Sequence, residues 1–419
     1  MSTLAKYSLG IGDRFGREGR AQLKAFMRTA ALGVTVIPVW NKSHREHLLV
    51  GSRPSEVRRE AETAVAELGW QNGFHVDADH INLGNVDLFL ADCDFFTIDV
   101  ADMIGRNDRT SSVPADYVRR FMASARNYFG VVSVPDLKAP LQVEPALVER
   151  TARQYLAAIE EAGRIYRRIE AVKGRDAFVT EISMDESAHP QRLVELLFIL
   201  KAIADEGIPV QTVAPKFCGS FLKGVDYVGD IDQFAREFEE HLAVVRFAVQ
   251  EFGLPSGLKL SIHSGSDKFS LYGPIRRAIR KHDAGLHLKT AGTTWLAELT
   301  GLALSGADGL AIAKEIYCRA LDRMDEMTVP YAAVLAIDRA ALPPADAVRE
   351  WNGDQFAAAL LHNPACSSYN PHFRARPCRL QNRRRNGAAF PAGAGNVPRL
   401  CCSVCQGQSL RTSPETLSF

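Results

Sequence analysis

The sequence predicts a (β/α)8 barrel of the TIM type with helical additions. Eight short apolar segments alternate with helical segments along the chain, which implies that the strands pair in parallel. Eight strand–helix units are also the number that closes such a barrel. In addition, polar side chains gather where these strands end, which is where barrels carry their active sites. A doubly wound open sheet is the alternative that the same alternation allows.

The strands are predicted from short runs of apolar and β-branched residues, such as VTVIPVW at 34–40. The predicted strands are 7–13, 34–40, 74–77, 95–100, 178–183, 210–216, 258–263 and 285–289. The segment 258–263 also alternates strictly between apolar and polar residues. Its apolar face consists of Leu258, Leu260 and Ile262, and its polar face of Lys259, Ser261 and His263. We expect the polar face to point into the barrel.

Helical periodicity fills the intervals between these strands. The helices that follow the strands are predicted at 19–32, 55–68, 82–91, 190–205, 231–252, 272–282 and 293–304. Two more helices, 114–128 and 144–172, form an excursion over about 105–175. Further helical pieces at 328–361 could close the bottom of the barrel or cover its side. We therefore expect one catalytic domain over 1–373.

The last part of the chain, 374–419, differs abruptly from the rest. It contains eight Arg, no Lys and one Glu, is rich in Pro, Gly and Cys, and shows no sustained period. A disordered tail is the plain interpretation. A reading-frame error in a GC-rich gene is the sharper one, because such codons read out of frame encode Arg, Pro, Gly, Ala and Cys. We favour a frame-shifted, disordered tail.

Composition is typical of a soluble enzyme. The 419 residues carry a net charge of +1, which gives no reason to expect a nucleic-acid or membrane partner. No apolar run approaches the roughly 20 residues of a membrane span, and the N-terminus lacks an apolar signal core. We expect a cytoplasmic protein whose cysteines outside the tail are reduced. Nothing in the sequence indicates the oligomeric state.

The densest group of ionisable residues is HVDADH at 75–80. Two His and two Asp within six residues suit a divalent cation that takes nitrogen and oxygen ligands, such as Zn, Mn, Co or Ni. The alternative is structural: Asp79 could cap the next helix, and His75 could be a buried core histidine. Further carboxylates and imidazoles at other strand ends favour the metal, because burying so many unpaired charges would be costly. The candidate metal ligands are Asp77, Asp79, His80, Glu181 and His263.

Lysines recur at the predicted strand ends. One of them could form a Schiff base with a ketone, but several lysines beside a candidate metal favour binding of a substrate carboxylate and hydroxyls. The segment SGSDK at 264–268 resembles an anion-binding loop, because Gly and Ser amides before a helix can hold an anion. The candidate substrate-binding residues are Lys42, Lys216, Ser264, Ser266, Lys289 and Thr290. The long loop 216–230 could be a lid or a plain surface excursion.

Three common motifs are missing from the sequence. GIGDRFG near the N-terminus lacks the spacing of a dinucleotide fingerprint, and neither a P-loop nor a GxSxG elbow occurs. The sequence therefore gives no support for a nucleotide cofactor or for a serine hydrolase of that type.

Six segments, in order along the chain, resemble the tagaturonate epimerase family. They are GFHVDADHINLGNVD, FTIDVAD, TEISMDE, VAPKFCGSFLKGVDYVGD, LSIHSGSDKFSLY and HLKTAGTTWLAEL. The likeness extends over about 7–373. Members of that family interconvert D-tagaturonate and D-fructuronate and depend on a divalent metal, so the resemblance implies an isomerase acting on a small ketouronate. The family continues with helical sequence beyond 362–374, where this chain departs, which fits a frame error.

The implied reaction constrains the chemistry. The two ketouronates differ at a carbon β to the ketone, whose hydrogen is not acidic, so simple enolisation cannot invert it. Retro-aldol cleavage, rotation of the aldehyde fragment and re-addition is the favoured route, with a metal as Lewis acid. Transient oxidation is the rival, but it would need a bound NAD. We expect Asp99 or Asp267 to move the hydroxyl proton and place Lys268 with them in the catalytic group.

Two other functions are compatible with these residues. A metal-dependent aldolase or ketose isomerase could use the same barrel. A sugar-acid-binding regulatory protein without turnover is the alternative of another class. The excess of ionisable residues at the strand ends argues against the regulatory protein, since binding alone rarely needs several carboxylates around a metal.

Overall fold

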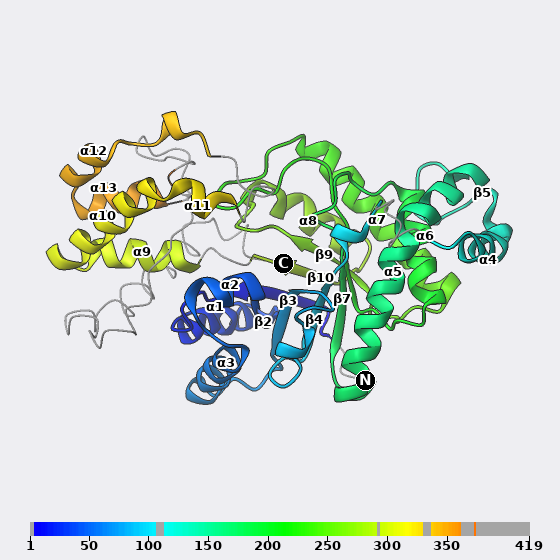
Figure 1. The fold of residues 1–419 in the computed structure, drawn as a ribbon, viewed down its shortest axis with the longest axis horizontal. Coiled ribbons are helices and arrows are strands. Elements are labelled where there is room, and N and C mark those ends of the chain that lie inside the picture. The colour runs from blue at the N-terminus through cyan, green and yellow to red at the C-terminus, as the bar shows by residue number, and fades with distance from the viewer. Residues whose placement is uncertain (1–3, 106–112, 291–293, 330–336, 362–372, 374–419) are drawn as a thin grey trace.

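The computed structural model describes residues 4–105, 113–290, 294–329, 337–361 and 373. Eight parallel strands close into a barrel in the spatial order β1-β2-β3-β4-β7-β8-β9-β10, with β10 pairing back to β1 (Figure 1). The strands are β1 (Tyr7–Gly12), β2 (Ile37–Ser43), β3 (His75–Ile81), β4 (Phe95–Asp99), β7 (Val179–Ser183), β8 (Thr212–Ala214), β9 (Lys259–His263) and β10 (Leu286–Lys289). The predicted barrel is confirmed, and the open sheet is wrong. The predicted frame-shifted tail at 374–419 lies outside the described residues.

Helices cover the outer face of the barrel because each presents an apolar stripe to the strands. The wall helices are α1 (Gly19–Ala31), α3 (Pro54–Leu68), α5 (Pro145–Lys173), α6 (Leu193–Asp205), α7 (Ile231–Phe252) and α8 (Phe269–Lys281). Outward side chains of the strands, such as Trp40, Phe96 and Leu260, are buried in the core that these helices share. On β9 the side chain of Ser261 is completely buried and that of His263 nearly so, which agrees with the predicted inward face.

The strand boundaries differ from the prediction by three residues or more at two places. β2 begins and ends three residues later than predicted, and β3 extends four residues beyond its predicted end. The helix predicted at 82–91 is replaced by a single 3-10 turn, η1 (Val86–Leu88). There Asn82 and Asn85 accept backbone N–H groups with their side chains, which favours a turn over a helix. A short helix that was not predicted, α2 (His44–Val50), follows β2 and is capped by Ser43.

The excursion between β4 and β7 forms an attached substructure on the side of the barrel. It contains η2 (Ala101–Met103), α4 (Ala115–Ala125), η3 (Arg126–Tyr128), β5 (Gly130–Val132) and β6 (Leu141–Val143), and then the long helix α5. The two short strands form an antiparallel hairpin, and the segment VPDLKAP at 134–140 connects them. Phe121 of α4 packs edge-on against Phe198 of α6, with ring centroids 6.3 Å apart. Figure 1 shows this substructure on the right of the barrel.

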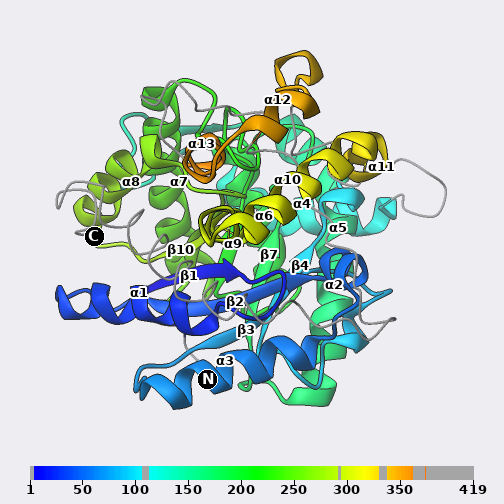
Figure 2. The same cartoon turned by 90° about the vertical axis from the view of Figure 1, so that its left-hand side faces the viewer.

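The helices after β10 form a second, smaller core of their own. They are α9 (Thr294–Leu304), α10 (Ala307–Asp322), α11 (Met324–Thr328), η5 (Arg339–Ala341), α12 (Ala345–Glu350) and α13 (Gly353–Leu360). At its centre Phe373 stacks on Tyr317 and meets Phe356 edge-on. The guanidinium of Arg14, just beyond β1, lies 5.8 Å from the ring of Trp295 of α9. These helices therefore lie on the side where the strands end, rather than closing the bottom, as Figures 1 and 2 show.

The interior of the barrel is divided into two layers. At the end where the strands begin, Leu4, Val39, Phe95 and Val179 form a small apolar cluster in which three of the side chains are completely buried. At the end where the strands finish, hereafter the mouth, the inward side chains are carboxylates, imidazoles, hydroxyls and one ammonium. None of the described helices is both long and apolar enough to cross a membrane.

Candidate active site

A buried ammonium organises the inner part of the mouth. Lys289, at the end of β10, places its Nζ 2.8 Å from Oδ2 of Asp77, 2.8 Å from Oδ1 of Asp79 and 3.4 Å from Oε1 of Glu181. Its Nζ also donates to Oγ1 of Thr97 at 2.6 Å. Burial alone would lower the pKa of Lys289, but the three carboxylates raise it well above its ordinary value. The ammonium therefore stays charged and draws three strands together.

A β-bulge turns His80 into the mouth. Asp77 and Asp79 point inward by alternation, so His80 would point outward on a regular strand. Instead, the pairing of β3 with β4 shifts between Ala78 and Ile81, and His80 has a left-handed φ of 54°. This conformation is uncommon for a residue with a Cβ and is found at sites where the surrounding structure imposes it. Two consecutive residues of β3 therefore face the same space, and Ile81 returns to the outer core.

Three side chains from three strand ends converge above Lys289. They are His80 near the end of β3, Asp185 after β7 and His263 at the end of β9, and one ligand atom from each lies within 4.8 Å of the others. Asp185 Oδ1 is 3.5 Å from His80 Nε2, and its Oδ2 is 3.2 Å from His263 Nδ1. Both nitrogens are buried and, among the described residues, neither has a hydrogen-bond partner. Two buried nitrogens directed at one carboxylate are a suitable donor set for a divalent ion.

The remaining nitrogen of each imidazole is held by a second carboxylate. Asp79 Oδ1 lies 2.6 Å from His80 Nδ1, and Glu181 Oε1 lies 2.8 Å from His263 Nε2. Thr212 donates to the other oxygen of Glu181 at 2.7 Å. Histidines that bind a metal commonly donate their other N–H to a carboxylate in this way, which fixes the ring and its tautomer. The geometry thus leaves the free nitrogen of each ring facing the shared space.

The charge of this cluster also favours a cation. Three carboxylates (Asp77, Asp79 and Glu181) surround the ammonium of Lys289, and a fourth, Asp185, faces the two imidazoles. Burial would raise the pKa of Glu181, but Lys289 and His263 lower it well below its usual range. Burial would lower the pKa of His263, yet Asp185 and Glu181 raise it to about 9. The carboxylates therefore require positive charge beside them, which a divalent ion supplies as well as two protonated imidazoles do.

A cavity of about 160 Å³ opens above these residues. Its wall includes the three converging residues, Ser43 at the end of β2, Arg45 of α2, and the β8–α7 loop, which carries Lys216 and Lys223. Lys216 Nζ donates to the carbonyl of Ser187. The cavity therefore combines a candidate metal site with cationic side chains at its rim, as a small anionic substrate requires.

Several residues predicted for the site lie elsewhere in the structure. Lys42 points to the outer face of β2 and donates to the carbonyl of Arg14 at 2.6 Å, because the strand runs three residues further than predicted. Lys268 donates to backbone carbonyls of the β8–α7 loop. Asp267 accepts the hydroxyl of Tyr272 at 3.0 Å. None of these side chains is part of the cavity wall, so the structure does not bring them to the converging imidazoles.

The small hydroxyl residues support the loops at the mouth. The hydroxyl of Ser264 donates to the carbonyl of Lys289 at 3.0 Å. The hydroxyl of Thr290 donates to the carbonyl of Gly10 at 3.2 Å. Ser266 donates to the carbonyl of Val225 at 3.1 Å. Asp99 ends β4 in register with Ser183, and it too is not part of the cavity wall. Burial raises its pKa above the ordinary value, and the charge of His80 lowers it in part. Of the residues in this paragraph, Asp99 is therefore the one whose environment suits proton transfer.

Sequence reasoning missed Asp185 and Lys223. A signal for Asp185 was present, because it continues the period-two series of Glu181 and Ser183 beyond the strand end. Ser183 donates to Oδ1 of Asp185 and holds it over the mouth. No comparable signal marks Lys223, since its position depends on how a long loop folds back over the barrel.

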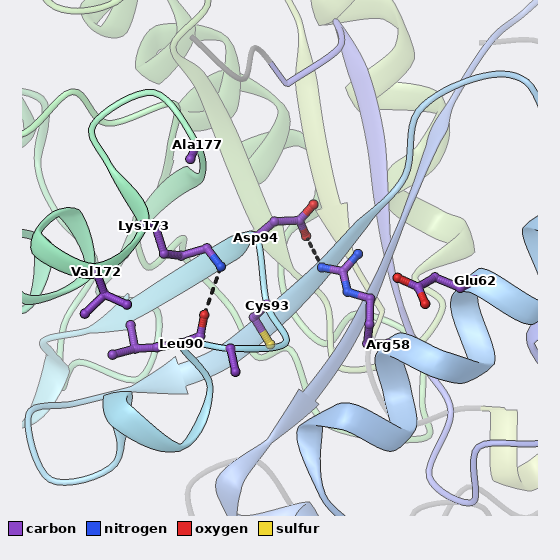
Figure 3. A pocket seen from close by; sticks show the side chains of 9 residues that line it. Arg58, Glu62, Leu90, Cys93, Asp94, Val172, Lys173 and Ala177 are labelled. Atoms are coloured by element: carbon purple, nitrogen blue, oxygen red, sulfur yellow. Dashed lines mark hydrogen bonds and ion pairs between the residues drawn. The ribbon is translucent and has the colours of Figure 1, made fainter.

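A second cavity, of about 410 Å³, lies away from the mouth (Figure 3). There Arg58 of α3 pairs with Asp94 at 2.9 Å, and Lys173 of α5 donates to the carbonyl of Leu90 at 2.9 Å. Asp94 also accepts the amide of Val76 at 2.7 Å. These contacts fasten the segment before β4 to two wall helices, so Arg58, Asp94 and Lys173 have structural partners.

Comparison with known proteins adds evidence of another kind. A family model described as UxaE, tagaturonate epimerase, matches residues 1–358. The tagaturonate/fructuronate epimerase of Thermotoga maritima is 28% identical over 353 residues, which is 82% of this chain and 68% of that protein. The native crystal structure of fructuronate-tagaturonate epimerase UxaE from Cohnella laeviribosi superposes with a TM-score of 0.75 at 24% identity, over 97% of this chain and 81% of that one. Its complex with one glycerol gives 0.69 at 25% identity, over 98% and 81%.

Proposed function

The chain belongs to the tagaturonate epimerase family, and we propose that it interconverts D-tagaturonate and D-fructuronate with the help of one divalent metal ion. It would thus be an isomerase of the epimerase class that acts on a small, anionic ketouronate. The related protein of Thermotoga maritima carries the name of this activity. We place the reaction in the cytoplasm, as part of sugar-acid breakdown.

One observation supports the metal most strongly. Two buried imidazole nitrogens, on His80 and His263, converge on Asp185, while a separate carboxylate holds the other nitrogen of each ring. His80, Asp185 and His263 would hold the ion, and Asp79 and Glu181 would orient the two rings. Asp77 and Lys289 would complete the layer beneath them. Three of the predicted ligands, Asp77, Asp79 and Glu181, therefore support the ligands in this assignment and do not bind the ion themselves. Zn, Mn, Co and Ni all accept this donor set.

The proposed route is retro-aldol cleavage followed by re-addition. When bound, the ion supplies Lewis acidity to the ketone side of the substrate. Asp99 takes the proton of the hydroxyl on the β carbon, and its raised pKa brings it closer to neutral pH, where proton transfer is effective. The bond between the α and β carbons breaks, the α carbon keeps the electron pair, and the β carbon becomes an aldehyde. The aldehyde turns, the bond forms again on its other face, and Asp99 returns the proton.

NMR of the products tests the proposal. The purified protein is incubated with D-tagaturonate after treatment with EDTA, and again after adding back Mn, Co, Ni or Zn. We expect D-fructuronate to appear only after metal is restored. Accumulation of two three-carbon fragments would indicate an aldolase instead. Saturable binding of the uronate without any new product, at every metal tested, would indicate a binding protein.

A further inference from the structure

One carboxylate on the wall of the mouth cavity comes from a helix rather than from a strand end. Glu46 lies on α2, the short helix that follows β2, and it lines the cavity. Ser43, the last residue of β2, caps α2 and accepts the amide of Glu46 at 3.3 Å. The helix therefore begins at the rim of the mouth. The side chain of Glu46 is only 8% exposed, and a carboxylate buried to this extent needs a partner.

Arg14 is that partner. It lies two residues beyond the end of β1, and its Nη2 is 3.1 Å from Oε1 of Glu46, with both side chains buried. Burial would raise the pKa of Glu46, but Arg14 and then Lys223 lower it below its ordinary value. Glu46 is therefore an anion at neutral pH, and one of its two oxygens is held in a fixed direction.

The other oxygen of Glu46 faces the cavity. None of the described residues donates a hydrogen bond to Oε2, and this atom is not fully enclosed by them. An ionised carboxylate accepts hydrogen bonds and donates none, so hydroxyl groups suit it. A ketouronate carries several hydroxyls, but it also carries a carboxylate, which Glu46 would repel. Glu46 therefore suits the part of such a substrate that is remote from its carboxylate.

Arg14 is also held by the helices that follow β10. Its guanidinium lies 5.8 Å from the ring of Trp295 of α9, and the neighbouring Phe15 packs against the core of these helices. Its carbonyl accepts a hydrogen bond from Lys42 at 2.6 Å. Arg14 itself is not part of the cavity wall. The direction of the Glu46 carboxylate thus depends on a residue that lies behind the wall and is fixed from several elements.

We infer that Glu46 binds a hydroxyl group of the substrate, at the end remote from the substrate carboxylate, and that Arg14 is the positioning residue that holds Glu46 in place. The inference rests on the proposed epimerase function, because that function makes the substrate a ketouronate. A substrate bound the other way round would bring two carboxylates together, which is unfavourable. Glu46 therefore selects the direction in which the substrate lies in the cavity.

Kinetics of Glu46→Gln provide the first test, with Glu160→Gln, at an exposed position of α5, as the matched control. Glutamine keeps the size of the side chain and removes its charge. In Glu46→Gln, KM for D-tagaturonate should rise about tenfold while kcat changes less, because a hydrogen bond to a charged group is weakened. The metal content of both variants and the kinetics of the control should match the unmodified protein. A KM in Glu46→Gln within about twofold of the unmodified protein would overturn the assignment.

Inhibition by galactarate tests the direction of binding. This sugar acid has a carboxylate at each end, so one of them must face Glu46 when the other takes the place of the substrate carboxylate. At a fixed concentration of free metal, galactarate should inhibit Glu46→Gln at least about tenfold more strongly than the unmodified protein. The same variant should bind tagaturonate more weakly, whereas a general loosening of the site would weaken both ligands. Equal or weaker inhibition of Glu46→Gln would overturn the orienting role.

Arg14→Met tests the positioning role. KM should rise about as far as in Glu46→Gln, and the double variant should lie within about twofold of Glu46→Gln alone, because both changes act on one interaction. Arg14→Lys keeps a cation and should restore part of the affinity. Increases in KM that multiply in the double variant would overturn the role of Arg14.

Urea unfolding tests the pair without using activity. Arg14→Met should lower the midpoint of unfolding, because it leaves a buried carboxylate without its partner, and adding Glu46→Gln should raise the midpoint again. A midpoint that falls further in the double variant would overturn the pair. An active protein whose KM is unchanged in Glu46→Gln would overturn the inference and leave the proposed function standing. If the unmodified protein never epimerises D-tagaturonate, the proposed function fails, and unfolding still decides whether Arg14 holds Glu46.

Discussion

The two layers inside the barrel are built from the same strands but hold different kinds of side chain. In the lower layer, Val39, Phe95 and Val179 fill the space with apolar volume. Two residues further along β7, Glu181 is equally buried but charged, and it depends on Lys289 and His263 for compensation. The lower layer can contribute stability without chemistry, because it holds no proton or ligand to exchange. The upper layer can carry chemistry, but its charges are tolerated only while each has its counterpart.

The largest expected effect of breaking the upper layer is on turnover. His263→Ala removes one nitrogen from the converging set, so turnover should fall by at least about 10³-fold and bound metal should be lost with it. Assays of epimer formation and elemental analysis of the same sample measure both. His189→Ala, at an exposed histidine, should change neither. Full metal content in His263→Ala would show that the ligand assignment is wrong.

Lys289→Met should give the largest loss of stability. It leaves Asp77, Asp79 and Glu181 buried without their ammonium, which costs about 3–5 kcal/mol of unfolding free energy. Urea unfolding at neutral pH measures this cost. The loss should shrink as the pH is lowered, because the carboxylates then take up protons. A loss below about 0.5 kcal/mol would mean that the upper layer does not depend on charge balance.

A change in the lower layer should lower stability but leave turnover and metal content unchanged. Val39→Ala removes two carbons from a completely buried side chain and should cost about 2 kcal/mol of unfolding free energy. Turnover per folded molecule and metal content should stay within about twofold, since no ligand or donor changes. Loss of metal from a stably folded Val39→Ala protein would contradict the separation of the two layers.

A smaller effect tests, at a residue outside the barrel, whether a buried charge needs an opposite charge beside it. Glu18 faces Asp13, Glu60 and Arg17, and burial followed by the two carboxylates raises its pKa to about 7. The folded state therefore binds a proton that the unfolded state releases above about pH 4.5, so stability should fall as the pH rises from there to about 7. In Glu18→Gln, the unfolding free energy should fall by about 1–3 kcal/mol less over this pH range. Urea unfolding at pH 5 and pH 8 measures it, and an unchanged pH dependence would contradict the account.

The sequence was sufficient to predict the barrel, because hydrophobic runs and alternation are local properties. It also placed His263, Glu181 and Lys289 correctly at strand ends that meet. His80 was predicted as a metal ligand from the composition of HVDADH, but the bulge against β4 that turns it inward is not revealed by local alternation. Lys42 was expected in the loop beyond the strand end, but the strand runs three residues further, so Lys42 lies within it on the outer face.

Long-range folding of loops accounts for the other differences. The SGSDK segment was predicted to bind an anion, yet Lys268 turns to carbonyls of residues more than 40 positions earlier in the chain. No local pattern encodes such a contact. Asp185 could have been predicted from the sequence, because it follows Glu181 and Ser183 at a spacing of two residues and so falls on the same face.

Titration with Co²⁺ tests the central claim most directly, because the absorption of this ion reports both its binding and its ligands. The metal-free protein should bind one equivalent and develop visible bands, and Asp185→Asn should weaken or abolish them while the protein stays folded. Bands of full intensity in Asp185→Asn, or no stoichiometric binding to the unmodified protein, would contradict a metal site formed by His80, Asp185 and His263.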